Sequence, residues 1–202
     1  MTGSVDNLVS YKLNGQQVIR SKPRRSNKPY SKAQLNNQQQ MKVLSAFLNE
    51  IDLTLKMGFG PEASGTTLNF HNVAVKYNKP HALAGHYPEV YIDYSKIVLS
   101  RGNLPQALNP EVAWVAEGIK FSWETDSECS WPHSEDQVML NAYSPEKNKH
   151  FFLQSGAKRT KGWEILEIPA KMHDERFELY ISFVSDDRCS VADSQYLGAI
   201  GI

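Results

Sequence analysis

The hydrophobic period of this chain changes from about 3.6 residues to 2 near Tyr87, and this change constrains the fold more than any other feature. Before Tyr87, apolar residues are spaced as on one face of a helix, whereas after it apolar and polar residues alternate. Helices followed by closely spaced short strands are typical of an α+β protein with antiparallel sheets. With 41% apolar and 10% aromatic residues, the chain has enough material for a core.

Residues 31–86 are predicted to form a helical hairpin. Ser31 and Gln34 have the spacing of a capping box, so we expect the first helix to begin after Ser31. Gly58 is expected to end this helix, because glycine is favoured just past a helix C-terminus. A second helix is predicted over 70–77. The apolar stripe of the first helix comprises Leu44, Phe47, Leu48, Ile51 and Leu55.

Residues 87–202 are predicted to form an antiparallel β-sandwich of the immunoglobulin or fibronectin type III kind. Six or seven short strands separated by turn-forming residues are typical of this architecture. A long loop over 125–136 is expected to follow the second strand. We expect strands at 90–94, 119–123, 138–142, 151–153, 163–168, 177–184 and 195–200.

Residues 1–30 are predicted to form a basic β-hairpin followed by an extended arm. The dipeptide Asn14-Gly15 suits a type I′ turn between strands at 9–13 and 17–20. Residues 21–30 hold two prolines, which remove backbone donors and disfavour helix before them. We therefore expect this stretch to be an extended arm.

Charge is divided unequally along a chain whose net charge is zero. The first 49 residues carry a net charge of +7 and the remaining 153 carry −7. Such a division favours docking of the basic head on an acidic surface, such as that of a neighbouring copy. Glu135 and Asp136 extend the acidic stretch, which holds no Lys or Arg. The expected partner-binding residues are Arg20, Lys22, Arg24, Arg25 and Lys28 in the basic arm, and Glu124, Asp126 and Glu128 in the acidic loop.

Motifs for catalysis, metal binding and nucleotide binding do not emerge from the sequence. His71, His81 and His86 lie close together, but their spacing matches neither a zinc finger nor a zinc protease motif. Cys129 and Cys189 are sixty positions apart, and the sequence leaves open whether they pair. We therefore predict a protein that is not an enzyme and has no catalytic residue, no metal and no cofactor.

Two other binding functions remain open. The basic arm, with Tyr11 and Tyr30 for base stacking, is compatible with nucleic-acid binding, although the chain is neutral overall. Trp131, beside Pro132 in the acidic loop, is a candidate for glycan binding. No stretch is apolar enough for a membrane span and no signal peptide is visible, so we expect a cytoplasmic or virion-associated or other particle-associated protein.

Several short motifs are spread along the chain: Arg20, Pro23, Pro29, Ser31, Gln34, Gly58-Phe59, Tyr87-Pro88, Ile92-Asp93-Tyr94, Ser100-Arg101-Gly102-Asn103-Leu104, Ser194, Tyr196, Leu197 and Gly198. Through these residues the chain resembles an uncharacterised family of Gram-negative bacterial proteins of about this length, classified as a domain of unknown function. The resemblance covers nearly the whole chain and implies continuity of fold but no activity. The basic opening is also similar to that of small phage-encoded structural proteins, which implies a role in an assembly.

Overall fold

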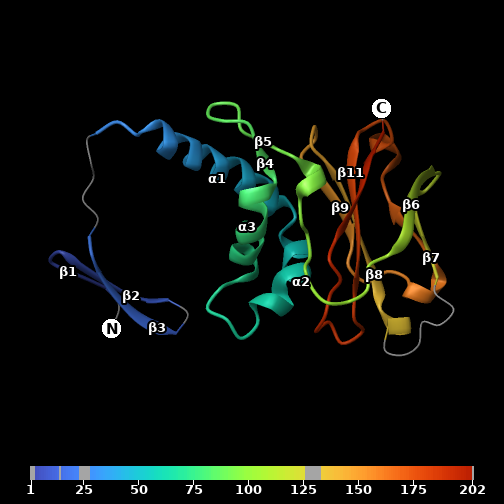
Figure 1. Cartoon of the computed structure of the whole chain (residues 1–202), viewed down its shortest axis with the longest axis horizontal. Coiled ribbons are helices and arrows are strands. Elements are labelled where there is room, and N and C mark those ends of the chain that lie inside the picture. Colours follow the sequence, from blue (N-terminus) through green and yellow to red (C-terminus); the bar gives the residue numbers. More distant parts are fainter. Residues whose placement is uncertain (1–2, 14, 23–27, 126–132, 202) are drawn as a thin grey trace. The chain divides into compact units, whose positions relative to one another are not determined.

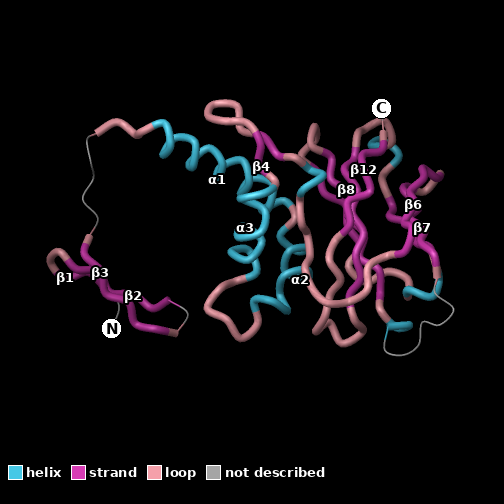
Figure 2. Tube along the Cα trace, viewed as in Figure 1, coloured by secondary structure: helices cyan, strands magenta, loops and turns pink. Residues whose placement is uncertain are grey.

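The computed structural model describes residues 3–13, 15–22, 28–125 and 133–201 (Figure 1). The chain divides into two compact units, residues 1–35 and residues 36–202. Helices and antiparallel strands are segregated along the sequence, as the tube view shows (Figure 2). The predicted α+β class is therefore confirmed.

The first unit contains a small antiparallel sheet in the order β1-β2-β3. Strands β2 (Leu8–Leu13) and β3 (Gln16–Ser21) form the predicted hairpin, with Tyr11 opposite Val18. The sequence did not predict β1 (Gly3–Val5), which pairs with β2 on its other side. We call these three strands the N-terminal sheet.

The predicted capping box at the first helix is confirmed. The Ser31 N–H donates to Gln34 Oε1 (2.9 Å), and the Gln34 N–H donates to Ser31 Oγ (3.3 Å). Each side chain thus satisfies a backbone donor that the helix itself leaves without a partner. Helix α1 (Lys32–Glu50) follows directly.

Residues 31–86, predicted to form two helices, form three. The apolar stripe predicted for the first helix is divided between α1 and α2 (Asp52–Ala63). The expectation that Gly58 ends the helix was wrong, since Gly58 lies inside α2. A Cβ atom at this position would lie only 2.2 Å from the Leu99 carbonyl oxygen. Glycine is therefore needed here for close packing of backbone against backbone. Helix α3 (Phe70–His81) is capped by Asn69, whose side chain accepts from the Asn72 N–H.

Two antiparallel sheets enclose the main core of the second unit. The sheet orders are β10-β7-β6 and β12-β11-β8-β9. Alternate residues of both sheets, among them Phe121, Leu140, Leu166 and Phe183, form one buried cluster. The strands are β6 (Leu108–Val115), β7 (Gly118–Glu124), β8 (Gln137–Ser144), β9 (Lys149–Leu153), β10 (Trp163–Glu167), β11 (Phe177–Val184) and β12 (Gln195–Ile200).

Two features of the strand prediction need correction. The sequence missed β6, which contains Pro110; this strand lies at a sheet edge, where proline is tolerated. The strand expected at 90–94 is only two residues long. Strand β5 (Tyr91–Ile92) pairs with β4 (Leu83–Ala84), and Asp93 then caps a 3₁₀ turn at Tyr94–Lys96.

The helices cover the other face of the four-stranded sheet. A second buried cluster joins Leu44, Phe47 and Phe59 of the helices to Tyr143 of β8 and Tyr180 of β11. The Phe47 and Tyr143 rings meet edge to face, with centroids 4.9 Å apart. The four-stranded sheet is therefore packed on both faces, and its central strand β11 is buried along its whole length.

A strap over 97–107 joins the helices to the end of the chain. Ser194 Oγ accepts from the N–H groups of Leu99 (2.9 Å) and Ser100 (3.4 Å), and Ser100 Oγ donates to the Ala192 carbonyl (2.8 Å). Leu104 forms a parallel bridge with Ala192. Two motifs of the family resemblance, 100–104 and 194–198, thus contribute to one structural contact.

Candidate docking surfaces

The N-terminal sheet exposes apolar side chains on both of its faces. Cross-strand partners share a face, so Val9, Tyr11, Leu13 and Val18 lie on one side with Arg20. The other side carries three exposed apolar residues: Val5, Leu8 and Ile19. Val5 is 77% exposed and Ile19 is 65% exposed. Sheets normally bury one apolar face, so this sheet has the surface of a docking element.

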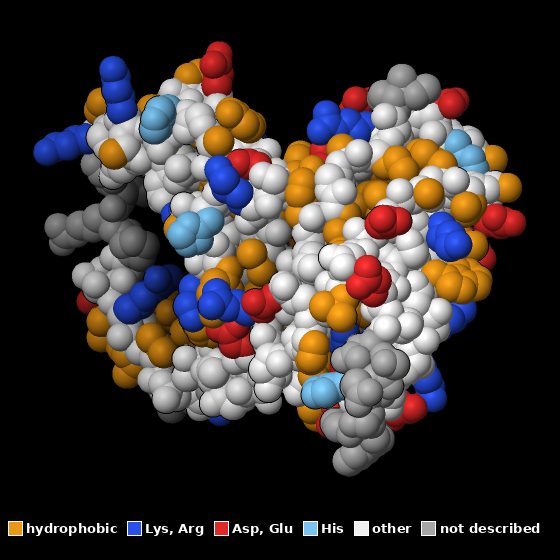
Figure 3. Space-filling view, turned by 45° about the vertical axis from the view of Figure 1, so that its right-hand side comes forward, with side chains coloured by type: hydrophobic (Ala, Val, Ile, Leu, Met, Phe, Trp, Pro, Cys, Tyr) orange, Lys and Arg blue, Asp and Glu red, His pale blue; other side chains and the backbone are white. Residues whose placement is uncertain are grey.

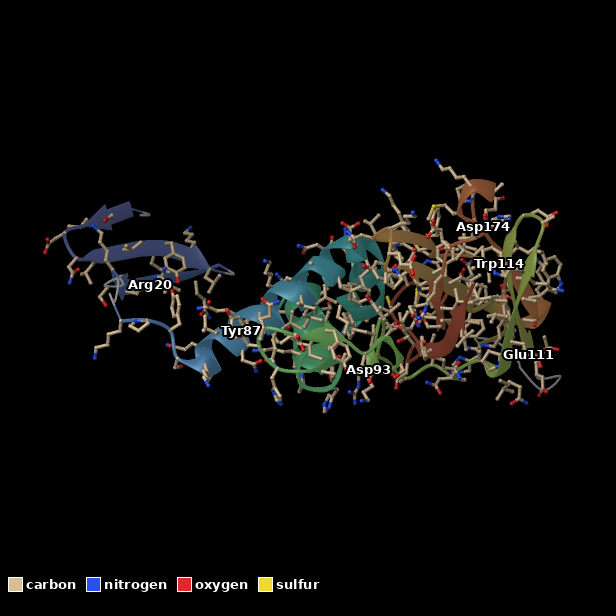
Figure 4. All side chains as sticks on the ribbon, turned by 90° about the horizontal axis from the view of Figure 1, so that it is seen from above. Arg20, Tyr87, Asp93, Glu111, Trp114 and Asp174 are labelled. Atoms are coloured by element: carbon tan, nitrogen blue, oxygen red, sulfur yellow. The ribbon has the colours of Figure 1, made fainter. Side chains whose placement is uncertain are left out.

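The structure brings two of the predicted arm residues together at the end of β3. The Arg20 guanidinium, which Figure 4 labels, lies 5.5 Å from the centre of the Tyr11 ring. Lys22 Nζ donates to the Asp6 carbonyl (2.6 Å), and the side chain is exposed. Lys28 is exposed as well, while Arg24 and Arg25 lie outside the described residues.

The structure describes one of the three residues predicted for the acidic loop. Glu124 ends β7 and is exposed, whereas Asp126 and Glu128 lie outside the described residues. Glu124 lines a shallow hollow of about 260 Å³ with Glu111 of β6, which Figure 4 labels. Two carboxylates from neighbouring strands therefore give this end of the three-stranded sheet an acidic surface.

The other two acidic residues of that stretch are paired with cations from a distant segment. Asp136 is 1% exposed and accepts from the buried Arg159 guanidinium (3.3 Å). The same guanidinium donates to the Pro105 and Gln106 carbonyls and lies over the Phe183 ring. Glu135 pairs with Lys158. Asp136 is thus a structural residue, and the expectation that it belongs to an exposed docking surface was wrong.

A groove separates the free edges of the two sheets. Strand β9 ends the four-stranded sheet and β10 ends the three-stranded sheet, so each has one unpaired edge. The space beside them has a volume of about 650 Å³. We call this space the edge groove, and its lining residues are 151–153, 155–157 and 164–167. Nothing in the local sequence pattern signals this groove, because it depends on which strands end the sheets.

Buried polar groups lie between the helices and the four-stranded sheet. Asn141 Oδ1 accepts from Thr54 Oγ1 (2.7 Å) and lies 3.0 Å from His150 Nε2. Burial lowers the pKa of His150 to about 4, although a hydrogen bond with the Glu50 backbone opposes this shift. The histidine is therefore neutral near pH 7 and helps to position α1 on the sheet.

A second buried polar group surrounds Glu178 of β11, which is 1% exposed. Its carboxylate accepts from Arg176 (2.8 Å) and from the Tyr196 hydroxyl (2.6 Å). Burial and then the bond to Glu178 raise the pKa of Tyr196 to about 12. Burial also raises the pKa of Tyr180, whose hydroxyl donates to the Tyr94 carbonyl. These contacts join β12 to β11 and hold the 3₁₀ turn at Tyr94–Lys96 on the four-stranded sheet.

The remaining candidate residues do not converge on one site. Within the described ranges, no three His, Cys, Asp or Glu side chains are grouped so that they could hold a metal ion. Cys189 is an exposed thiol, while Cys129 and Trp131 lie outside the described ranges. Trp163 is 41% exposed, and Lys120 and Lys161 lie over its ring. In the part of the chain that the structure describes, no helix is long and apolar enough to span a bilayer.

Acidic and basic side chains are interspersed over the face shown in the space-filling view (Figure 3). A family model described as a family of unknown function, DUF6266, matches residues 1–198. No curated protein and no solved structure matches the chain.

Proposed function

Because this chain belongs to DUF6266, a family of unknown function, we propose a role from its own surface chemistry: it is a non-catalytic structural and interaction protein. It forms part of a larger protein assembly, such as a phage-like or surface particle, and is cytoplasmic or particle-associated. The basic N-terminal segment docks on an acidic surface of a neighbouring copy. The observation that carries this proposal is the N-terminal sheet, which exposes apolar side chains on both faces.

Charge supports a second copy as the partner. The first 49 residues carry +7 and the rest of the chain −7, so head and body of different copies attract each other. The apolar faces of the N-terminal sheet supply surface to bury, and Arg20 and Lys22 supply orientation. A contact between head and body is heterologous, so it closes into a ring or continues as a filament.

We also propose that the second half of the chain is an immunoglobulin or fibronectin type III sandwich. Numbered from β6 to β12, the first, second and fifth strands share one sheet, and the third, fourth, sixth and seventh share the other. Immunoglobulin-type sandwiches likewise place the first, second and fifth strands in one sheet and the third, sixth and seventh in the other. The fourth strand is the one whose sheet differs among such domains.

The test of the docking function is the solution mass of the untagged protein, measured by light scattering at low and high salt. We expect a multimer at low salt that dissociates as ionic strength rises, because exposed ion pairs are screened. The double substitution Arg20→Glu and Lys22→Glu should dissociate it at low salt. The control, Lys56→Glu with Lys171→Glu, makes the same charge change at exposed positions of the second unit and should leave the mass unchanged.

A monomer at all salt concentrations would overturn the docking proposal, as would a multimer that ignores the reversal at Arg20 and Lys22. The nucleic-acid alternative predicts a raised 260/280 nm absorbance ratio and retention on random duplexes that falls steeply with salt. One observation favours the nucleic-acid alternative: the Arg20 guanidinium lies over the Tyr11 ring, so a cation and an aromatic ring lie close together on the N-terminal sheet. The glycan alternative rests on Trp131, which lies outside the described residues, so it stays a prediction.

A further inference from the structure

The edge groove lies beside β9 and β10, and each of these strands has one edge that pairs with no described strand. Among the described strands, β9 pairs with β8 alone and β10 with β7 alone. Phe151 and Leu153 of β9 point towards the core but remain half-buried, because no strand covers them on the open side. An unpaired edge beside apolar side chains is a template for an added strand.

The carboxylate of Glu164 points inwards and lines this groove. Glu164 of β10 lies opposite Phe121 of β7 and therefore faces the core side of its sheet. Its Oε1 accepts from the Ile165 N–H (3.1 Å), and its Oε2 accepts from the Ala157 N–H (2.6 Å). Lys161 Nζ also lies 3.5 Å from Oε1. An inward-pointing charge at a strand edge disfavours a purely apolar strand, which would remove water from the carboxylate without adding a partner. A strand that carries a cation at the matching position would be accepted.

Strand β3 of the N-terminal sheet has that pattern. It is the last strand of its sheet, so one of its edges is unpaired. Val18 and Arg20 lie on one face, and Ile19 lies on the other. In β10, Glu164 and Leu166 face the core side, while Ile165 faces outwards. The two strands therefore match residue by residue when they run antiparallel.

We propose that β3 of a second copy adds to the free edge of β10 and fills the edge groove. In this register Arg20 lies opposite Glu164, Ile19 opposite Ile165, and Val18 opposite Leu166. The pairing joins one opposite-charge pair to two apolar pairs, the combinations that stabilise neighbouring strands. The partner is a second copy of this chain because the donor is basic and the acceptor belongs to the acidic part of the chain.

This inference rests on the proposed docking function and names its acceptor site. Addition of β3 to β10 also accounts for both exposed faces of the N-terminal sheet. One face continues the core side of the three-stranded sheet, and the other continues its outer side. Each copy keeps its own β3 and its own β10, so the contact repeats from copy to copy.

The first test is a disulfide between two differently substituted proteins. In both chains Cys129 and Cys189 are replaced by serine; one chain then carries Ile19→Cys and the other Ile165→Cys. After mixing and oxidation with oxidised glutathione, we expect a cross-linked heterodimer. Because each chain holds one cysteine, a bond between the two proteins reports contact between copies only.

The matched control replaces Ile165→Cys by Ala113→Cys, an exposed position of β6 at the opposite edge of the same sheet. We expect at least about tenfold less cross-linking with this partner, because disulfides need Cα atoms within about 7 Å. Equal cross-linking at 113 and 165, or none at either position in a sample that is multimeric, would overturn the acceptor site.

A charge exchange provides an independent test. Arg20→Glu and Glu164→Arg should each weaken association by about tenfold or more, and a chain with both changes should recover most of it. The two hypotheses fail differently. A wild-type monomer overturns the docking function itself. A salt-sensitive multimer with no cross-link at 165 and no recovery in the double variant overturns only the β10 acceptor.

Discussion

The N-terminal sheet and the four-stranded sheet of the second unit have the same kind of strand pairing but opposite surroundings. The pair β8–β11 in one sheet and the pair β2–β3 in the other are both antiparallel ladders in regular register. Strand β11 is buried along its whole length, whereas no described residue of β1, β2 or β3 is fully buried. Both sheets therefore have hydrogen-bonded strand pairs, but only the four-stranded sheet has fully buried apolar side chains. The difference indicates that the second unit carries the stability of the chain and the N-terminal sheet carries its capacity to associate.

The largest effect is expected from removal of the buried ion pair between Asp136 and Arg159 in the second unit. Asp136→Ala leaves the Arg159 guanidinium buried without its carboxylate, and we expect a loss of about 3–5 kcal/mol in the free energy of unfolding. Glu135→Ala, which removes the exposed pair with Lys158, should cost less than about 1 kcal/mol. Urea unfolding followed by tryptophan fluorescence measures both. Equal losses would contradict the assignment of Asp136 as structural.

Acid should affect the two units unequally. The pKa of His150 is about 4 in the folded protein and near 6.5 when unfolded, so the unfolded chain binds the proton more tightly. The free energy of unfolding is therefore unaffected by His150 above pH 6.5 and falls as the pH drops towards 4, by up to about 3 kcal/mol.

The measurement is chemical unfolding across this pH range for wild type and His150→Gln. The substitution should reduce the slope of unfolding free energy against pH. Residues 1–35 contain no histidine, so NMR signals of β2 and β3 should show no titration between pH 5 and 7. An unchanged slope in the variant would place the acid sensitivity elsewhere.

The start of α1 should respond weakly and locally. Ser31→Ala removes the acceptor for the Gln34 N–H, and the loss of such a cap costs about 1 kcal/mol. Hydrogen exchange should speed up for the first turn of α1 and remain unchanged in β8 and β11. Faster exchange in those core strands would show that the cap supports more than the helix terminus.

The smallest effect is expected at the N-terminal sheet. Ile19→Ser, studied at high salt and low protein concentration, should change the free energy of unfolding by less than about 0.5 kcal/mol, because Ile19 is exposed. The same substitution should weaken association at low salt. A large loss of stability in the monomer would remove the contrast between the two units.

The sequence predicted the elements whose pattern is local. Alternation in 119–123 and 138–142 located the buried strands β7 and β8, and the Ser31-Gln34 spacing located the start of α1. The sequence missed what depends on distant partners. Gly58 faces the Leu99 backbone, and Asp136 meets an arginine 23 positions later. The local sequence around Gly58 or Asp136 gives no indication of these partners, Leu99 and Arg159.

The candidate docking surfaces were predicted in the same partial way. Charge counting selected Arg20 and Lys22, which the structure places at exposed positions, and their role in docking stays a prediction. It also counted Glu135 and Asp136 as accessible, because their partners Lys158 and Arg159 lie on another segment. The edge groove was not predicted, because a strand edge is defined only once the order of the strands is known.

The strap has a consequence for how the chain is made. Its hydrogen bonds join residues near 99 to residues near 194, so they close a loop of more than ninety residues. A ribosome adds about 5–20 residues per second, and these bonds cannot form until the last segment has emerged. The helices are synthesised first but gain the strap last. Until β8 and β11 have emerged, the apolar faces of α1 and α2 have no sheet to pack on, so we expect chaperones to bind the growing chain during this interval.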